Sequence, residues 1–282
     1  RTCLETGPTA MRKILTYDIS EIVPYINWIY FFHAWGLSGK PREEKERVQA
    51  DALAMLQTWE GRYHTRALFA LLAANSDGDD LLLDDVRIPM LRQQHPTEPG
   101  SPNLCLADFV RPLSQGVEDT AGVFCTTVDG LIVEAYKHDE YNRMLAQVLC
   151  DRLAEGTAER MHEEVRRHYW GYAPDEKLTM KETHNEAYQG IRPAVGYPSL
   201  PDTSVNFILN DLLGMKDVGI RLTESGMMVP HASVSGFMFS HPLSRYFDLG
   251  KIGEDQLRDY ACRRGIPVEV MRRFLQSSLL KR

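Results

Sequence analysis

The 282-residue chain contains few cysteines, and no two of them form a CxxC pair. They are odd in number and far apart: Cys3, Cys105, Cys125, Cys150 and Cys262. A disulfide framework is therefore not expected, and no Cys/His group has the spacing of structural zinc ligands. Dispersed, unpaired cysteines are typical of a reduced compartment, so we expect a cytoplasmic protein.

Long apolar runs and an excess of positive charge are also missing. No stretch approaches eighteen uncharged apolar residues, so we expect no membrane span. The first residues have no basic end followed by an apolar run, so we expect no secretory signal. Nucleic-acid partners normally need a basic patch, and the net charge of −7 argues against them.

Several common catalytic motifs are absent. The chain has no GxGxxG after a strand, no GxxxxGK[ST], no GxSxG and no HExxH. A Rossmann-type dehydrogenase or a conventional methyltransferase acting on a small acceptor is therefore poorly supported.

What the sequence does contain predicts an α+β fold in one domain, residues 1–282, with residues 1–18 as a candidate flexible lead-in. A hydrophobic content of 43% is sufficient for a large core. Strands are expected in hairpins rather than in regular βαβ units. Helical spacing marks 19–37 (interrupted at Pro24), 43–60, 140–169 and two helices within 253–280, around Gly265 and Pro267. Strand-like runs are 67–74 and 81–83 around an Asp-Gly turn, then 121–128, 218–223, 233–239 and 244–249.

An acidic turn and a lone asparagine could each be functional, but the residues alone do not decide this. The acidic turn at Asp77, Asp79 and Asp80 lacks the length and the closing glutamate of a calcium loop, so we expect a solvated turn. Asn27 is the strongly polar residue among aromatic neighbours, where a helix cap or a satisfied core amide is the simpler role.

A polar stripe is predicted on the helix at 140–169. At 100° per residue, Asp151, Glu155 and His162 fall within roughly 40° of one another. Met161 lies on a different side, toward the core. The stripe could dock a partner or tune a proton, but such a stripe is usually a solvated face.

Residues 188–201 combine glycines, tyrosines and prolines with one arginine, and this composition predicts a stiff, irregular loop. Gly190 and Gly196 can take backbone angles that other residues avoid. Arg192 offers a planar fork for a carboxylate, and Tyr197 an aromatic face with a hydroxyl. The loop is either a cradle for a small zwitterion with an aromatic ring or a rigid connector whose arginine pairs with a surface acid.

Many short segments, in consistent order, resemble one family: the reactivation domain at the C-terminus of cobalamin-dependent methionine synthase. The loop matches that family's Arg-Pro-x-x-Gly-Tyr-Pro signature at Arg192–Pro198. The other matching segments are Trp35–Gly39, Cys105–Phe109, His138–Asn142, Asp151–Glu155, Tyr169–Pro174, Leu222–Ser225, Ala232–Gly236, Phe239–Pro242 and Ser244–Phe247.

The resemblance implies a C-shaped single domain with a twisted antiparallel sheet flanked by helices, binding S-adenosylmethionine in a shallow groove. Such a domain supports reductive methylation of cob(II)alamin to methylcobalamin, with an electron from a flavodoxin-type donor or reductase. The cobalamin, and the zinc that activates homocysteine, are expected in other modules of the enzyme. Because the sulfonium is already activated, no general acid or base is expected in this chain.

The resemblance also implies a set of site residues. Arg192 would contact the methionine part of the ligand, and Asn27 stands where we expect aspartate. Asp151 and Glu155 would face the cobalamin-binding module. The remaining implied ligand positions are Ala194, Gly196, Tyr197, Tyr246 and Phe247.

One segment departs from the family. Residues 201–206 read Pro-Asp-Thr-Ser-Val-Asn, where many members carry Pro-(Asp or Glu)-His-Thr-Glu-Lys. This departure, together with Asn27, keeps open a second hypothesis: a non-catalytic module that binds S-adenosylmethionine or a cobalamin protein and regulates without turnover.

Overall fold

A curled antiparallel sheet lies at the centre of the computed structural model, which describes residues 11–96 and 98–280. Its strand order is β4-β3-β2-β5-β8, and β1 pairs with β2 beside β3. The strands are β1 (Met11–Asp18), β2 (His64–Asp77), β3 (Asp80–Leu83), β4 (Val86–Pro89), β5 (Asp119–Val128) and β8 (Ser233–Met238). A second, two-stranded sheet joins β6 (Arg221–Leu222) to β7 (Met228–Val229).

The two central strands explain why the core has two sides. In β2, Phe69 and its alternate neighbours face one apolar cluster, while Leu68 and its alternates face another. Phe69 lies opposite Phe124 of β5, so the same alternation continues across the sheet. With both faces covered, β2 and β5 are near-continuous apolar runs, as the sequence predicts for residues 67–74 and 121–128.

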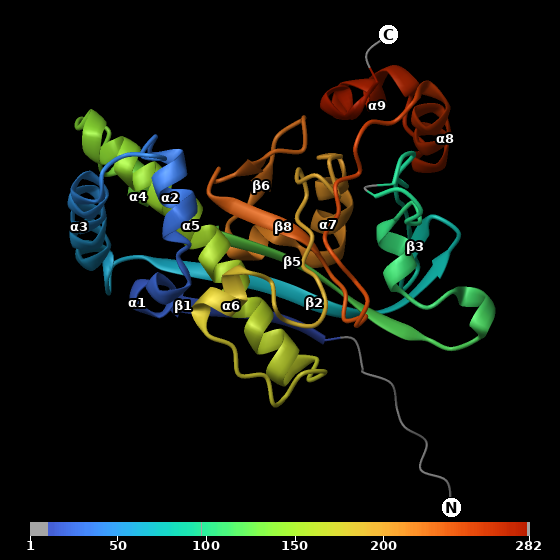
Figure 1. The fold of residues 1–282 in the computed structure, drawn as a ribbon, viewed down its shortest axis with the longest axis horizontal. Helices are drawn as coiled ribbons and strands as arrows, with labels where there is room; N and C mark the ends of the chain where they lie inside the picture. Colours follow the sequence, from blue (N-terminus) through green and yellow to red (C-terminus); the bar gives the residue numbers. More distant parts are fainter. Residues whose placement is uncertain (1–10, 97, 281–282) are drawn as a thin grey trace, which may run out of the picture.

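Helices cover both faces of this sheet. The long α5 (Glu140–Glu164) packs on β2 and β5 from one side, and α7 (Val205–Leu213) packs on β5 and β8 from the other (Figure 1). The remaining helices near α5 are α1 (Ile19–Ile22), α2 (Trp28–Ala34), α3 (Arg42–Trp59), α4 (Leu131–Glu134) and α6 (Met180–His184). The helices expected at 43–60 and 140–169 are confirmed, and a 3₁₀ turn at Val23–Tyr25 contains the predicted break at Pro24.

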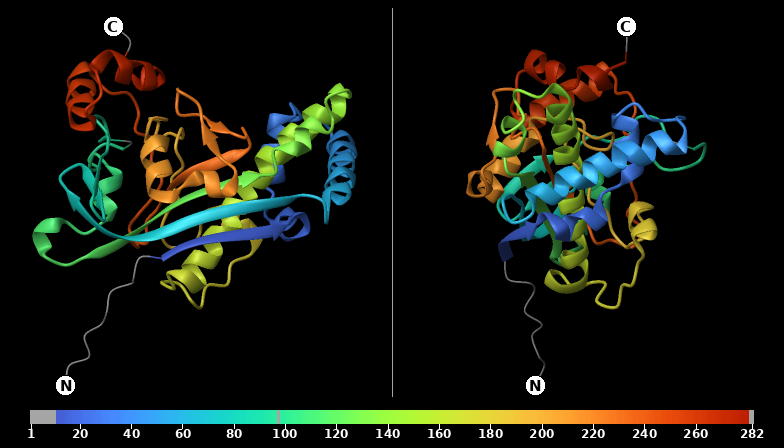
Figure 2. Two further views of the ribbon diagram at one scale, coloured as in Figure 1. Left: turned by 180° about the vertical axis from the view of Figure 1, so that it is seen from behind. Right: turned by 90° about the vertical axis from the view of Figure 1, so that its left-hand side faces the viewer.

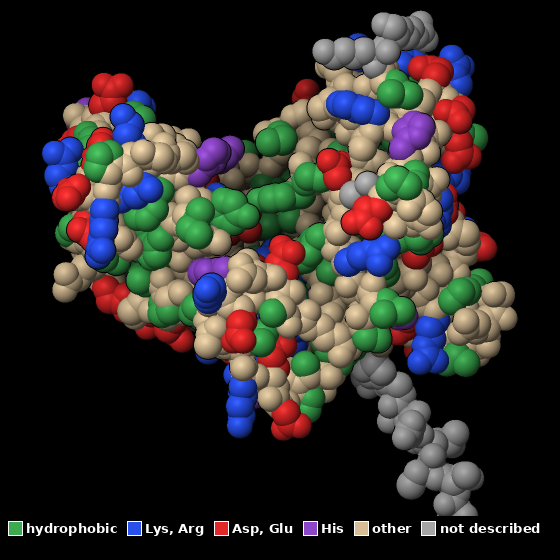
Figure 3. Space-filling model, viewed as in Figure 1, with side chains coloured by type: hydrophobic (Ala, Val, Ile, Leu, Met, Phe, Trp, Pro, Cys, Tyr) green, Lys and Arg blue, Asp and Glu red, His purple; other side chains and the backbone are tan. Residues whose placement is uncertain are grey.

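The last two helices form a lobe with its own small core. They are α8 (Glu254–Arg264) and α9 (Val268–Phe274), and Gly265 ends the first of them at φ +63°. This lobe lies across from α2 and α3, as the view from behind shows (Figure 2, left). The hollow between the two sides gives the molecule the expected C shape (Figure 3).

Two sequence expectations are wrong, and a third holds only in part. Residues 11–18 form β1 rather than a lead-in, whereas residues 1–10 lie outside the described part. Residues 244–249 are not a strand, and 218–223 contains a 3₁₀ turn followed by the two residues of β6. Residues 11–18 are a strand because they pair with β2 along their whole length.

The acidic turn between β2 and β3 is also different from the solvated turn that we expected. The Asp80 carboxylate is nearly buried and pairs with Arg87 at 2.7 Å and with Arg263 of α8 at 2.6 Å. Asp79 pairs with Arg92 at 2.7 Å. No group of potential metal ligands gathers anywhere in the described chain. The turn therefore attaches the C-terminal lobe to the sheet through charge.

The loop at 188–201 runs beside β8 as an irregular extension of the sheet. Ile191 bridges to Phe239, and Ala194 bridges to Gly236. The Pro193 carbonyl accepts the Phe237 N–H at 3.0 Å. Since proline has no N–H to donate, this segment cannot continue as a regular strand, which confirms the stiff loop.

Gly236 is the residue that lets this loop approach the sheet. A Cβ placed there would lie 2.0 Å from the Pro193 oxygen, a distance that no backbone atoms tolerate. We predict that Gly236→Ala lowers the free energy of unfolding by about 2 kcal/mol, as overpacking typically does. Urea denaturation followed by circular dichroism measures this loss.

The control is Gly130→Ala, because that Cβ would meet the ring of Pro230 at 3.1 Å and the backbone there has φ −66°. A loss for Gly236→Ala no larger than that of the control would show that the loop is not seated on β8 as described.

Candidate ligand-binding site

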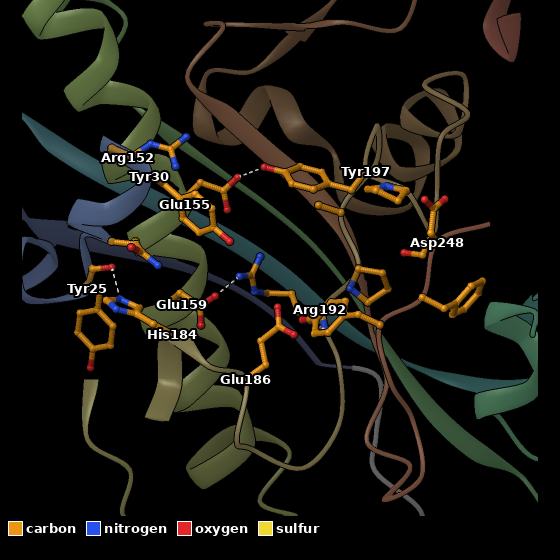
Figure 4. Close-up of a pocket in the computed structure, with 18 residues that line it drawn as sticks. Tyr25, Tyr30, Arg152, Glu155, Glu159, His184, Glu186, Arg192, Tyr197 and Asp248 are labelled. Carbon is orange, nitrogen blue, oxygen red and sulfur yellow. Dashed lines mark hydrogen bonds and ion pairs between the residues drawn. The ribbon is translucent and has the colours of Figure 1, made fainter. Parts of the chain in front are cut away.

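A cavity of about 660 Å³ opens on the concave side of the molecule (Figures 3 and 4). It lies between α5, the segment from the 3₁₀ turn at Val23–Tyr25 into α2, and the loop at 188–201. Its size suits a cofactor-sized small molecule. Its walls combine apolar and aromatic surfaces with several charged groups. The lining residues are Tyr25, Asn27, Tyr30, Arg152, Glu155, Gly156, Glu159, His184, Glu186, Arg192, Pro193, Ala194, Tyr197, Pro198, Ser199, Tyr246, Phe247 and Asp248.

Arg192 enters the cavity from the loop and is held at both ends. Its main-chain N–H donates to the Tyr246 hydroxyl at 2.8 Å. Its side chain is 6% exposed, and the guanidinium pairs through Nη2 with Glu159 of α5 (Figure 4) and lies 5.5 Å from the centre of the Phe124 ring. Burial lowers the pKa of Arg192, but Glu159, Tyr246, Tyr188 and Glu155 together outweigh this effect, and the pKa is raised overall. Arg192 is therefore a fixed, permanently charged group.

A buried network supports this arrangement from behind. The Tyr246 hydroxyl is hydrogen-bonded to that of Tyr188 at 3.2 Å. The guanidinium of Arg166 lies over the Tyr188 ring, 4.1 Å from its centre, and pairs with Glu176 at 2.6 Å. Burial is the main cause of the raised pKa of Tyr188. Tyr188 therefore stays neutral, and the guanidinium on its ring face and the hydrogen bond at its hydroxyl hold it in place.

His162 belongs to this network and not to the polar stripe that we predicted. Its ring is fully buried and stands edge-on to Tyr188 at 5.0 Å. Nδ1 accepts a hydrogen bond from Arg166 at 2.9 Å, so a neutral ring carries its proton on Nε2. Burial, reinforced by the charges of Arg166 and Arg192, holds the pKa of His162 well below its usual value.

The other two residues of the predicted stripe, Glu155 and Asp151, have different surroundings. Glu155 lines the cavity and accepts a hydrogen bond from the Tyr197 hydroxyl across its mouth (Figure 4). Asp151 lies outside the cavity, 3.5 Å from His231. Burial raises the pKa of Asp151, although His231 opposes that effect.

The ligand positions that the sequence predicted come together, with one exception. Asn27, Arg192, Ala194, Tyr197, Tyr246 and Phe247 all line the cavity. Gly196 does not line the cavity. It takes a left-handed backbone conformation (φ +90°) in a turn, and its N–H donates to the Leu200 carbonyl at 2.8 Å. Asn27 also caps α2, since its Oδ1 accepts from the Ile29 N–H at 3.1 Å.

Residues 18–265 match the family described as vitamin B12 dependent methionine synthase, activation domain. The chain belongs to this family. A solved structure described as the MetH reactivation domain bound to AdoHcy shares 38% of its residues with this chain and superposes with a TM-score of 0.90. That match covers 96% of this chain and 91% of the other.

The sequence analysis did not predict several residues that line the cavity of this activation domain. Glu159 lies one helical turn beyond Glu155, so an i, i+4 reading of α5 could have found it. His184 and Glu186 come from the segment around the end of α6, where no periodic signal points to the cavity. His184 is held there by a 3.1 Å hydrogen bond between its Nε2 and the carbonyl oxygen of Tyr25.

The departure at 202–206 lies behind the cavity rather than on its wall. Asp202 is 1% exposed and pairs with Arg264 at 2.6 Å. Asn206 is buried and accepts a hydrogen bond from Ser235 of β8 at 2.5 Å. Asp202 keeps the acid that the family carries there. Of the residues that depart from the family, Ser204, Val205 and Asn206 are buried in the core beneath the loop, and Thr203 is half-buried.

No helix in the described ranges, 11–96 and 98–280, combines the length and apolar character needed to cross a membrane.

His162 makes the stability of the activation domain depend on pH in a defined window. The pKa of His162 is lowered in the folded state. Below about pH 6.5 the unfolded chain therefore binds a proton at this residue and the folded chain does not. We predict that this group lowers the free energy of unfolding by about 1.4 kcal/mol per pH unit from pH 6.5 to 5. Urea denaturation at each pH measures the slope.

His162→Gln cannot take up this proton, so its slope over the same window should be shallower by about one proton. Equal slopes in the two proteins would show that His162 is not the group that titrates. The comparison does not depend on the absolute stability of the variant.

Proposed function

We propose that this activation domain binds S-adenosylmethionine in the cavity and supports the reductive methylation of cob(II)alamin to methylcobalamin, which reactivates methionine synthase. The observation that carries the proposal is the buried, fixed guanidinium of Arg192 inside a cofactor-sized cavity. A guanidinium in this setting suits the carboxylate of an amino-acid ligand. The match to a domain described as bound to AdoHcy supports the same ligand class.

The charges around Arg192 suit a ligand that carries a sulfonium. Four carboxylates line the cavity (Glu155, Glu159, Glu186 and Asp248), against the two guanidinium groups of Arg152 and Arg192. Burial raises the pKa of Glu186, and the neighbouring Glu159 raises it further. The negative surplus would attract a cation, while Tyr197 and Phe247 would offer aromatic faces to adenine.

The chemistry asks the chain for orientation rather than for acid–base catalysis. The methyl group moves from the sulfonium of S-adenosylmethionine to reduced cobalamin, and S-adenosylhomocysteine is left. Arg192 would fix one end of the ligand, and the walls would direct the methyl group toward the open mouth. We therefore assign ligand-binding residues and no general base to this domain.

The partners follow from the same reaction. The cobalamin-binding module would dock on the concave side, where Glu155 lies at the mouth and Asp151 beside it. A flavodoxin-type donor or reductase would supply the electron in the cytoplasm. Cobalamin and zinc would be held by other modules of the enzyme.

One observation favours a second candidate, a regulatory module that binds without turnover. Asn27 presents an amide to the cavity where the family is expected to present a carboxylate. A weaker grip on a cationic ligand would suit sensing better than turnover.

The proposed function is tested by mixing the chain with a module loaded with cob(II)alamin, a reductant and S-adenosylmethionine. We expect methylcobalamin to appear, in its absorption spectrum, when the chain is present and not without it. Binding of S-adenosylmethionine with no methyl transfer would instead favour the regulatory module.

Arg192→Ala should weaken S-adenosylmethionine binding by about 100-fold, the loss expected for a charge-assisted hydrogen bond in a buried site. Isothermal calorimetry measures the affinity. Arg192→Lys keeps the charge that Glu159 needs but loses the planar fork, so it should fold normally and still bind weakly. Unchanged affinity in both variants would exclude Arg192 from the site.

Asn27→Asp should tighten S-adenosylmethionine binding about 10-fold, because it adds a negative charge beside a cationic ligand. Aspartate caps helices as well as asparagine does, so α2 should be retained. Calorimetry with S-adenosylmethionine measures the gain, and no change or a loss would remove Asn27 from the proposed contacts.

A further inference from the structure

Glu159 is the one carboxylate of the cavity that pairs with Arg192 among the described residues. It lies on α5 one turn beyond Glu155, and its side chain is 18% exposed. The contact joins Glu159 Oε1 to Arg192 Nη2. The second oxygen of Glu159 and Nε of Arg192 are buried, and neither has a hydrogen-bond partner in the described part of the molecule.

This pairing leaves part of the guanidinium available. Glu159 occupies one terminal nitrogen, and no described residue is hydrogen-bonded to the other, Nη1. The opposite end of Arg192 is fixed through its main chain by Tyr246. A long, flexible side chain is thus held in one direction before any ligand arrives, which removes much of the ordering entropy that binding would otherwise cost.

Resting on the proposed function, we propose that Glu159 is a positioning residue that aims Arg192 at the carboxylate of the ligand. Its contribution then applies only to ligands that carry the amino-acid group. The sulfonium and the adenosine part are recognised elsewhere in the cavity, so they do not depend on Glu159.

Two other roles for Glu159 predict different behaviour. If it competed with the ligand carboxylate for Arg192, binding would leave Glu159 as a partly buried, unpaired charge, which is strongly unfavourable. If it attracted the sulfonium directly, its ion pair with Arg192 would already have neutralised most of that attraction. The geometry of one occupied and one open terminal nitrogen avoids both difficulties.

Three ligands separate these roles in the intact chain. S-adenosylmethionine carries both the amino-acid group and the sulfonium. S-adenosylhomocysteine carries the amino-acid group but has a neutral thioether in place of the sulfonium, and 5′-methylthioadenosine lacks both groups. For Glu159→Gln we expect about 10-fold weaker binding of the first two ligands and unchanged binding of the third. Isothermal calorimetry measures all three affinities.

The matched control is Glu164→Gln. Glu164 is on the same helix, is also 18% exposed and also pairs with an arginine, Arg160 at 2.9 Å, but it does not line the cavity. All three affinities should be unchanged in this variant. Its thermal unfolding, beside that of Glu159→Gln, shows how much stability an ion pair of this kind contributes.

Every other outcome contradicts the proposal and indicates a different role for Glu159. Loss confined to S-adenosylmethionine would assign Glu159 to the sulfonium, and equal loss for the three ligands would make its role structural. Tighter binding of the two amino-acid ligands would make it a competitor. Failure of the unmodified chain to bind S-adenosylmethionine would refute the proposed function itself, so the two failures are distinguishable.

Discussion

The close approach of residues 191–194 to β8 is the constraint on which the site depends. Gly236 has no side chain, so the Pro193 carbonyl can accept a hydrogen bond from the next residue of the strand. The sheet thereby fixes the backbone on both sides of Arg192, and β8 is itself fixed by β5. A loop that would be mobile on a surface becomes as rigid as the strands beneath it.

Helix α5 is the second element that supports the site, and two different sides of it contribute. Its cavity side presents Glu155 and Glu159 to the loop, whereas Arg166, just beyond its end, is fully buried with His162. Buried charges are tolerated here because each has an ion-pair or hydrogen-bond partner. Stability, charge and the shape of the cavity therefore depend on the same few side chains.

The sequence was a good guide where local pattern and packing agree. The apolar runs of β2 and β5, the amphipathic α3 and the end of α8 at Gly265 follow from periodicity and glycine chemistry. It failed where partners distant in the chain decide. The helical angle of His162 was correct, but residues around Tyr188 cover it, and β1 is a strand because β2 pairs with it.

The C-terminal lobe has a consequence for how the concave surface can work. Arg263 pairs with Asp80 of the sheet, and Arg264 pairs with the buried Asp202 beneath the loop at 188–201, each at 2.6 Å. Swinging the lobe outward would separate both pairs and leave the Asp202 carboxylate uncompensated. The spacing between the two arms of the C is thus set during folding, and any protein that enters must already have a matching width.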